Sequence, residues 1–214
     1  MLRFSRLAPL LQFGVAVVAL IVVSGCALQP ATSASNSVTV SPISLRPQFS
    51  IAGRFSAKNG SEQASGQFRY AQSGDGGSDG ITRQMSLFSP LGTPLAEINA
   101  DRASATLTLA NGHVQRAASL TDLMRTVIDL PVTDLMLSAW LQGQPFDASV
   151  LAATSSERDA SGAPTRFVES GWEIMVSARM DGSANAAAPK RMRWSLLGQP
   201  DTEVRWVIDE WSAP

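Results

Sequence analysis

Apolar and polar residues alternate along most of the chain beyond residue 48. The stretch at 49–55 has this two-residue period, and it recurs at 65–71 with Phe68 and Tyr70 on one face. Alternation of this kind is typical of half-buried β-strands. Strands are therefore predicted at 49–55, 65–71, 81–88, 95–100, 103–110, 113–117, 165–169, 172–178, 191–197 and 202–211.

Short connections join most of these strands. Asn111 and Gly112 form a strong hairpin signal before the strand at 113–117, because both residue types tolerate positive φ. The Gly/Ser/Asp-rich segment at 73–80 is interpreted as a flexible turn, since no glutamate follows at the position that closes a calcium loop. Consecutive strands with short connections pair antiparallel.

The period then changes to that of a helix. Apolar residues have helical spacing at 119–130 and again at 133–141, with Pro131 between the two segments. Thr133 is placed to cap the second helix, and Gly143 is placed to end it. Strands, two helices and strands again predict a mainly β fold with helices on one side of an antiparallel sheet.

An apolar run near the N-terminus leads into a box of small residues. Arg3 and Arg6 precede the run at 13–23, and Val-Ser-Gly-Cys follows at 23–26. The order resembles a bacterial lipoprotein signal, and the run is shorter than the roughly 20 residues of a membrane-spanning helix. We expect Cys26 to be lipidated and to begin the mature chain; the alternative is an ordinary signal peptide that contains a cysteine.

Three segments are expected along the chain. Residues 1–25 form the cleaved signal peptide, 26–47 a lipidated flexible tether rich in Ser, Ala, Thr and Pro, and 48–214 one domain. A short strand at 37–40 is the alternative within the tether. Ala27 follows the cysteine, where an aspartate would favour retention in the inner membrane, so the sequence points to the outer membrane.

Charge argues against a nucleic-acid partner. The chain has 17 Lys and Arg against 18 Asp and Glu, a net charge of −1, and so lacks a basic footprint. Charged residues make up only 16% of the chain and hydrophobic residues 44%, which indicates more apolar surface than a simple core requires.

The sequence also lacks the motifs of an enzyme. His113 is the single histidine and follows a hairpin turn, and Cys26 is the single cysteine. Neither a nucleophile elbow nor a cluster of metal ligands is present in the sequence. We therefore expect no catalysis, no metal and no cofactor, although distant carboxylates can meet in a fold.

Large apolar side chains are abundant instead: 7 Met, 5 Trp and 8 Phe. Met85, Leu87, Met192, Trp194 and Trp206 share one face of their predicted strands. An ordinary packed core is one explanation of this pattern. A curved sheet closed by two or three helices, with an apolar cavity between them, is the other.

Several short stretches recur in a recognisable order. They are 49–55 with Gly53-Arg54, the Ser-Pro-Leu-Gly at 89–92, 96–100, Asn111-Gly112, Leu130-Pro131 followed by Leu137, Trp140, Gly143 and Pro145, and 204–211 with Asp209 and Trp211. In this order, and with the lipid-attachment box, they resemble the LolB family of outer-membrane lipoproteins. The extra residues around 73–80 and 183–188 fall in predicted loops.

The resemblance implies a function as well as a fold. It implies an incomplete antiparallel β-barrel closed by helices around a cavity for acyl chains. It also implies a monomer, anchored on the periplasmic face of the outer membrane, that accepts acylated lipoproteins from a LolA-type carrier and inserts them into the inner leaflet. Two other interpretations stay open: a lipidated scaffold that binds a protein partner, and a binder of another amphiphile.

Candidate site residues follow from the strand faces and the resemblance. The expected cavity lining is Met85, Leu87, Ala96, Ile98, Leu137, Trp140, Met192, Trp194, Val204, Trp206 and Ile208. Arg83 shares the inward parity of these strands, and we expect it to extend into solvent at a strand end or to meet a headgroup at the rim.

Leu91 is a separate candidate. It lies between Pro90 and Gly92 in a predicted turn, where a large apolar residue is out of place. The alternative to exposure is a side chain folded back onto the core. The resemblance implies that this loop protrudes and helps to drive cargo into the membrane.

Overall fold

The computed structural model describes residues 45–74, 80–128, 132–152, 156–181 and 188–213. The expected signal peptide, the lipidation site at Cys26 and the possible strand at 37–40 lie outside the described residues. The described residues all belong to one compact unit, Thr39–Pro214.

The described residues form one antiparallel sheet of eleven strands. The strands are β1 Phe49–Asn59, β2 Glu62–Ser73, β3 Thr82–Phe88, β4 Pro94–Ala100, β5 Ala105–Leu109, β6 Val114–Ala117, β7 Glu157–Arg158, β8 Pro164–Glu169, β9 Trp172–Arg179, β10 Pro189–Leu196 and β11 Thr202–Ser212. Their order across the sheet is β6-β5-β4-β3-β2-β1-β11-β10-β9-β8-β7. The first and last strands are therefore neighbours at the centre, and the sheet has free edges at β6 and β7.

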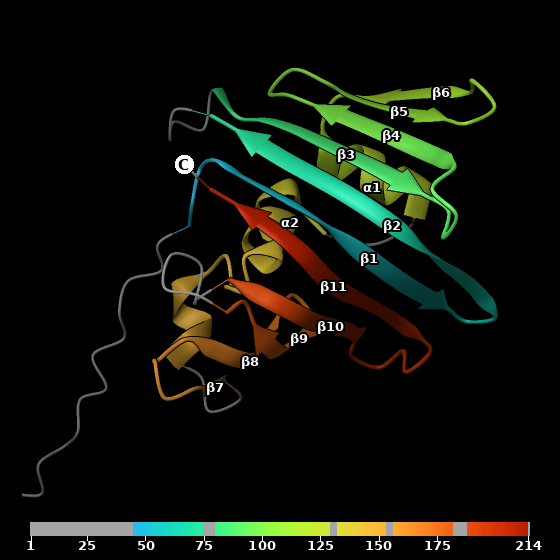
Figure 1. Cartoon of the computed structure of the whole chain (residues 1–214). Helices are drawn as coiled ribbons and strands as arrows, with labels where there is room; N and C mark the ends of the chain where they lie inside the picture. Colours follow the sequence, from blue (N-terminus) through green and yellow to red (C-terminus); the bar gives the residue numbers. More distant parts are fainter. Residues whose placement is uncertain (1–44, 75–79, 129–131, 153–155, 182–187, 214) are drawn as a thin grey trace, which may run out of the picture. The chain divides into compact units, whose positions relative to one another are not determined.

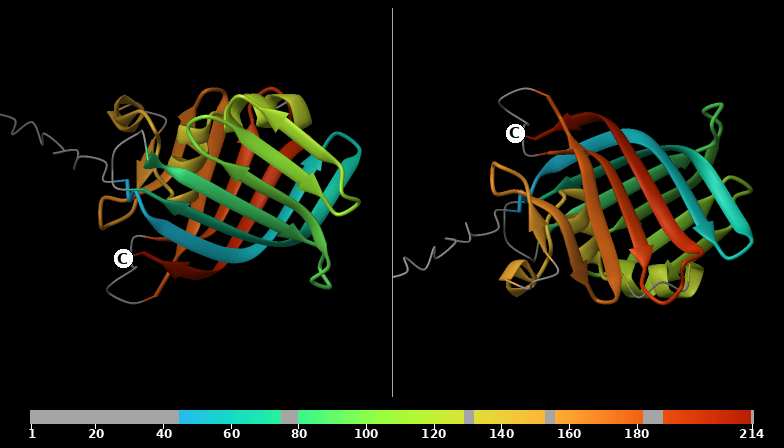
Figure 2. Two further views of the ribbon diagram at one scale, coloured as in Figure 1. Left: turned by 90° about the horizontal axis from the view of Figure 1, so that it is seen from above. Right: turned by 90° about the horizontal axis from the view of Figure 1, so that it is seen from below.

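Helices cover the concave side of this sheet (Figures 1 and 2). They are α1 Leu120–Ile128 and α2 Asp134–Leu141, whereas the 3₁₀ helix at Ala148–Ala152 lies beside β8. The predicted end signals of α2 are confirmed: the Thr133 side chain accepts a hydrogen bond from the backbone N–H of Met136 at 3.2 Å. Gly143 has φ +67°, which ends the helix in the left-handed region that favours glycine.

The curvature has a local cause at the centre of the sheet. The pairing of β1 with β11 shifts register between Ala52 and Gly53. A Cβ at Gly53 would lie 2.0 Å from the backbone oxygen of Val207, so only glycine allows the strands to approach this closely. A bulge of this kind bends and twists a sheet, and here it lets the strands wrap around the helices.

The observed sheet exceeds the prediction at several strand ends and in one predicted loop, and β2 extends beyond both of its predicted ends. β1 continues to Asn59, four residues beyond its predicted end, because it pairs along this length with both β2 and β11. The only apolar residue in that extension is the small Ala57, so its hydrophobic alternation is weak in the sequence. The loop predicted after the second helix contains the 3₁₀ helix and the two-residue β7, which is too short to show any period.

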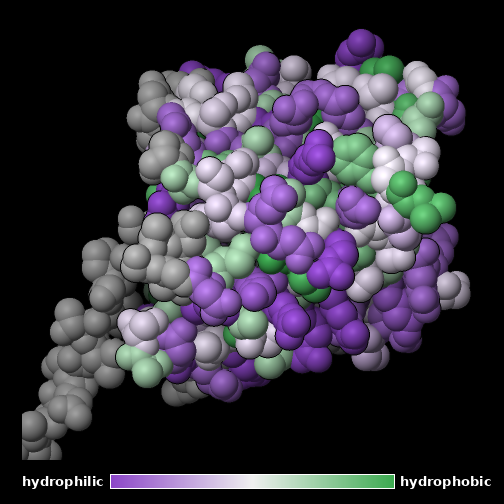
Figure 3. Space-filling view, viewed as in Figure 1, coloured by the Kyte–Doolittle hydropathy of each residue, from purple (hydrophilic) through white to green (hydrophobic). Residues whose placement is uncertain are grey.

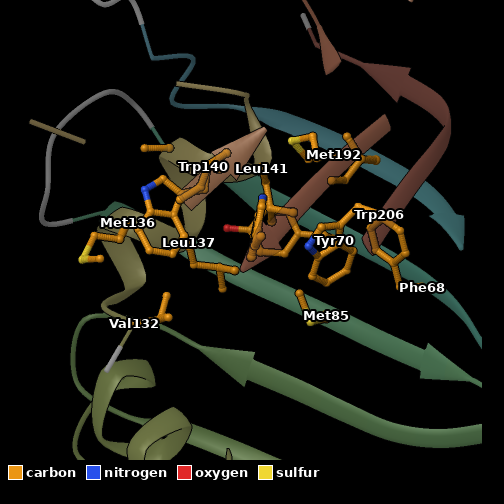
Figure 4. Packing of buried hydrophobic residues seen from close by; sticks show 14 of the residues in the cluster. Phe68, Tyr70, Met85, Val132, Met136, Leu137, Trp140, Leu141, Met192 and Trp206 are labelled. Carbon is orange, nitrogen blue, oxygen red and sulfur yellow. The ribbon is translucent and has the colours of Figure 1, made fainter. Parts of the chain in front are cut away.

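Aromatic side chains form the centre of the core on the concave side (Figure 4). Trp194 lies between Trp140 and Trp206, with ring centroids 5.5 Å and 5.1 Å away. Phe68 meets Trp206 edge-on at 4.8 Å. The convex face carries exposed polar side chains such as Arg54 and is mostly hydrophilic (Figure 3). None of the described helices is long and apolar enough to cross a bilayer.

Candidate functional site

A hollow of about 610 Å³ lies between the concave side of the sheet and the helices. Its walls come from strands β1 to β5 and β9 to β11, from α1 and α2, and from Val132 between the helices. The lining residues are Phe55, Ala57, Lys58, Asn59, Glu62, Gln63, Ala64, Met85, Leu87, Ala96, Ile98, Leu107, Leu109, Leu123, Met124, Val132, Leu137, Trp172, Trp194, Thr202, Val204 and Trp206. Apolar residues dominate this list, so the hollow suits an apolar ligand.

Strand register brings the apolar residues into neighbouring rows. Met85 pairs with Ile98, and Leu87 pairs with Ala96. Ile98 in turn pairs with Leu107. Since residues paired across antiparallel strands point to the same face, these side chains form one continuous wall.

Eight of the eleven residues expected to line a cavity do border this hollow. They are Met85, Leu87, Ala96, Ile98, Leu137, Trp194, Val204 and Trp206. The other three, Trp140, Met192 and Ile208, do not: each is at most 2% exposed and packed within the core. The periodicity of a strand or helix predicts the face on which a residue lies, but not how far the hollow extends along that face.

Other lining residues were not predicted. Leu107 and Leu109 share a face of β5, and Leu123 and Met124 share the inner face of α1. The alternation and helical spacing of these residues were visible in the sequence and could have marked them. Phe55 and Ala57 lie on the part of β1 that runs to and beyond its predicted end.

Polar residues occupy one end of the hollow. Lys58, Asn59, Glu62 and Gln63, which flank the β1–β2 turn, are exposed and form what we term the polar rim. Thr202 beside them is buried, and its Oγ1 donates to Asn59 Oδ1 at 3.0 Å. The apolar walls therefore lead to a hydrophilic border at this end of the sheet.

Tryptophan rings form the floor of the hollow. A Glu169 carboxylate oxygen accepts a hydrogen bond from Trp140 Nε1 at 2.6 Å, and the same carboxylate accepts from the backbone N–H groups of Phe146 and Asp147. Trp140 is thus held beneath Trp194 rather than at the surface of the hollow. Among the described residues, the indole N–H of Trp194 has no hydrogen-bond partner, so packing alone holds that ring.

The environment of the Arg83 side chain differs from the predicted one. Its side chain is 8% exposed, and its Nη1 lies 3.1 Å from Asp134 Oδ2 at the start of α2. Arg83 therefore does not extend into solvent, and it is not among the residues that border the hollow. Arg83 also interacts with Tyr70. Burial raises the pKa of Tyr70, and its hydroxyl donates to Gln72 Oε1 at 3.0 Å. Parity placed Arg83 on the inner face correctly, but an ion pair with a helix was not visible in the sequence.

Leu91 is the most exposed large apolar side chain among the described residues, at 96%. The backbone N–H of Gly92 donates to Ser89 O at 2.9 Å, and Gly92 has φ +86°. Gln67 Nε2 also donates to Pro90 O at 3.1 Å, which fastens the turn to β2. The expected exposure is confirmed, and the side chain does not fold back onto the core.

The described residues include the single histidine but no candidate metal centre. His113 is exposed beside the β5–β6 turn. Within residues 45–213, apart from the gaps given above, no three His, Cys, Asp or Glu side chains form a group that could hold a metal ion.

The described fold is an incomplete antiparallel barrel with helices over an apolar hollow, an architecture that suits apolar ligands. The family model described as "Outer membrane lipoprotein LolB" matches residues 47–211. The chain therefore belongs to the LolB family, and it is a lipid-anchored protein of the outer membrane.

Two relatives by sequence agree with this assignment. The outer-membrane lipoprotein LolB of Ralstonia nicotianae is 28% identical over 97% of this chain and 98% of its own length. That of Thiobacillus denitrificans is 32% identical over 81% of this chain and 85% of its own. A solved LolA superfamily protein from Nitrosomonas europaea has a TM-score of 0.48 at 8% identity, covering 79% of this chain and 89% of that chain.

Proposed function

We propose that the domain receives the acyl chains of other lipoproteins in its hollow and inserts them into the outer membrane. The observation that carries this proposal is the apolar hollow of about 610 Å³ in a member of the LolB family. That volume lies in the range of roughly 300–1,000 Å³ that is usual for ligand sites. Acylated Cys26 would anchor the receptor beside the bilayer that takes the cargo.

Such a hollow would avoid a large free-energy cost of exposing acyl chains to water. Exposing a chain of about 15 methylenes to water costs on the order of 12 kcal/mol, so acyl chains require cover while they cross an aqueous space. A soluble LolA-type carrier that passes its cargo directly into this hollow avoids that cost. The direction of transfer then needs only a difference in affinity, about 1.4 kcal/mol for each factor of ten.

Release into the bilayer is assigned to the β3–β4 turn. A leucine that is 96% exposed at a turn tip gains about 1.5–3 kcal/mol when it leaves water for the leaflet. Leu91 would therefore bring the hollow to the membrane surface after the cargo has bound. We accordingly expect Leu91→Glu to retain uptake and to lose delivery.

A two-step transfer assay tests both steps. Acylated lipoprotein passes from a LolA-type carrier to the purified receptor, and then from the receptor to liposomes. Ala96→Phe fills part of the hollow and should reduce uptake, whereas the matched Ala71→Phe on the exposed face of β2 should not. Equal uptake by these two variants would refute the cavity assignment, and equal delivery by Leu91→Glu and wild type would refute the role of Leu91.

Two alternatives give different results in the same preparation. A scaffold that binds a protein partner would take up no acylated peptide, and the hollow argues against it. A receptor for another amphiphile would co-purify with free lipid, and that lipid would not be displaced by acylated peptide. The molecular mass of the purified receptor tests the expectation of a monomer.

A further inference from the structure

The chain contains the same short pattern twice. Residues 89–94 read Ser-Pro-Leu-Gly-Thr-Pro, and residues 195–200 read Ser-Leu-Leu-Gly-Gln-Pro. The shared pattern is Ser-x-Leu-Gly-x-Pro, with Leu91 in the first copy and Leu197 in the second. Neither six-residue segment contains a charged side chain.

Both copies form a turn with an exposed leucine followed by a glycine. Leu197 is 52% exposed, and Gly198 has φ +82°, close to the φ of +86° at Gly92. The backbone N–H of Gln199 donates to Leu196 O at 3.2 Å, so Leu197 occupies a central position of this turn. The backbone N–H of Leu197 donates to Gly171 O at 2.8 Å, which fastens the turn to the neighbouring β8–β9 connection.

Strand pairing directs both turns toward the end of the sheet that carries the polar rim. Asn59 pairs with Thr202, so the β10–β11 turn lies beside the β1–β2 turn. Phe88, the last residue of β3, pairs with Gln67 in the half of β2 that leads to the same turn. Figure 1 shows the β1–β2, β3–β4 and β10–β11 turns on the right-hand side of the sheet.

We propose that Leu197 is a second bilayer contact, which meets the membrane together with Leu91 at the end of the hollow that carries the polar rim. This inference rests on the proposed function and adds a contact to it. Two leucines on separate turns, with strands β2 and β1 between them, do not form the contiguous patch of a protein interface. A bilayer accepts isolated protruding side chains, and the polar rim between them suits the headgroup layer. Two contacts also orient the opening, which a single contact leaves free to rotate.

Depth measurements on the full chain test this contact without any cargo. Cys26 is the only native cysteine, and its acylation leaves an introduced cysteine as the sole free thiol. Leu197→Cys, Leu91→Cys and Leu135→Cys are each labelled with an environment-sensitive fluorophore. The lipidated proteins are then placed in liposomes of phosphatidylethanolamine and phosphatidylglycerol, with and without acyl-chain nitroxide lipids.

Leu135 is the matched control. It is 41% exposed but follows Asp134, which contacts Arg83 at the start of β3, near the opposite end of the sheet. Nitroxide lipids should quench the label at Leu197 as they quench the label at Leu91, and they should leave the label at Leu135 bright. Quenching at Leu197 no stronger than at Leu135 would overturn the proposal.

A charged variant then distinguishes a contact of Leu197 with the bilayer from a contact with a protein partner. Leu197→Glu should lower delivery to liposomes roughly three- to tenfold, since a half-exposed leucine has about half of its burial still to gain. Uptake from the carrier should not change. Loss of uptake would assign Leu197 to a carrier interface and overturn the bilayer contact. If wild-type protein transfers no lipoprotein at all, the proposed function fails, while the quenching experiment still decides the role of Leu197.

Discussion

The ion pair between Arg83 and Asp134 predicts an asymmetric response to mutation. Arg83 belongs to β3 and is 8% exposed, whereas the Asp134 side chain is 32% exposed at the start of α2. Thr121 Oγ1 also donates to Asp134 Oδ1 at 3.3 Å. Asp134→Ala should therefore destabilise the fold far more than Arg83→Met, although each variant removes the same pair.

The magnitudes follow from what each variant leaves behind. Asp134→Ala leaves a guanidinium buried without its counter-charge, which costs roughly 3–5 kcal/mol for a fully buried pair. Partial exposure of Asp134 lowers this to about 2–4 kcal/mol, including a small loss at the helix N-terminus. Arg83→Met leaves a carboxylate that water and Thr121 still reach. It also removes Arg83 Nε, which has no partner among the described residues, so its net cost should be about 1 kcal/mol or less.

Urea unfolding followed by tryptophan fluorescence measures both changes. With a slope of about 2 kcal/mol/M, Asp134→Ala should shift the midpoint down by roughly 1–2 M, and Arg83→Met by no more than about 0.5 M. The double variant should be more stable than Asp134→Ala alone, because it no longer buries an unpaired charge. Equal losses for the two single variants, or a double variant no better than Asp134→Ala, would refute this reasoning.

Three further outcomes are expected. Cys26→Ala should abolish lipidation, and incorporation of a fatty-acid analogue into that variant would contradict the anchor. Glu169→Ala should cost about 2–4 kcal/mol in thermal unfolding, because it leaves the Trp140 indole N–H buried without its acceptor; an unchanged melting temperature would contradict this. Burial of Asp159 opposes its ionisation, but hydrogen bonds from Ser161 and Arg179 prevail and lower its pKa to about 2. The folded pKa of Asp159 lies below its ordinary value of 3.8. The ionised Asp159 therefore stabilises the fold above about pH 4, and this stabilisation is lost as the pH falls toward 2. Asp159→Asn should therefore lower stability at neutral pH and flatten its decline over that acid range, and an unchanged decline would count against the assignment.

The sequence predicts the sheet well because its physical signal is local. Alternation in β2 and β11 identifies the inward-facing residues, and the structure buries Phe68, Tyr70, Trp206 and Ile208 as expected. Capping residues such as Thr133 predict helix ends for the same reason, since the cap bonds its own first turn. Strand order is not local, and the pairing of β1 with β11 joins the two ends of the domain.

The sequence could not predict how deeply each inward-facing side chain is buried, and so which of them border the hollow. Trp140 in α2 and Trp194 in β10 both have large apolar side chains on faces that the sequence periodicity turns inward, yet only Trp194 borders the hollow. The difference arises because Glu169, 29 residues away along the chain, fixes the Trp140 indole beneath the floor. Arg83 shows the same limit, because its inward direction was predictable and its partner Asp134 was not. The size of a cavity depends on such long-range contacts, whereas periodicity reports only on neighbours.

The end of the hollow that carries the polar rim gives the two proposed leucine contacts a physical role. Because β6 and β7 do not close on each other, the hollow owes its cover to the helices and its border to the turns at one end of the sheet. Cargo that leaves through that end would meet water unless the bilayer already touches it, at a cost on the order of 12 kcal/mol for a chain of about 15 methylenes. One leucine would contribute at most about 3 kcal/mol, which would bring the turn to the membrane but would not set the angle of the opening. A second contact at Leu197 would fix that angle, so delivery should fall further in a protein carrying both Leu91→Glu and Leu197→Glu than in either single variant. If the double variant delivers cargo as well as Leu91→Glu does, the second contact does not orient the opening, and Leu91 alone accounts for release.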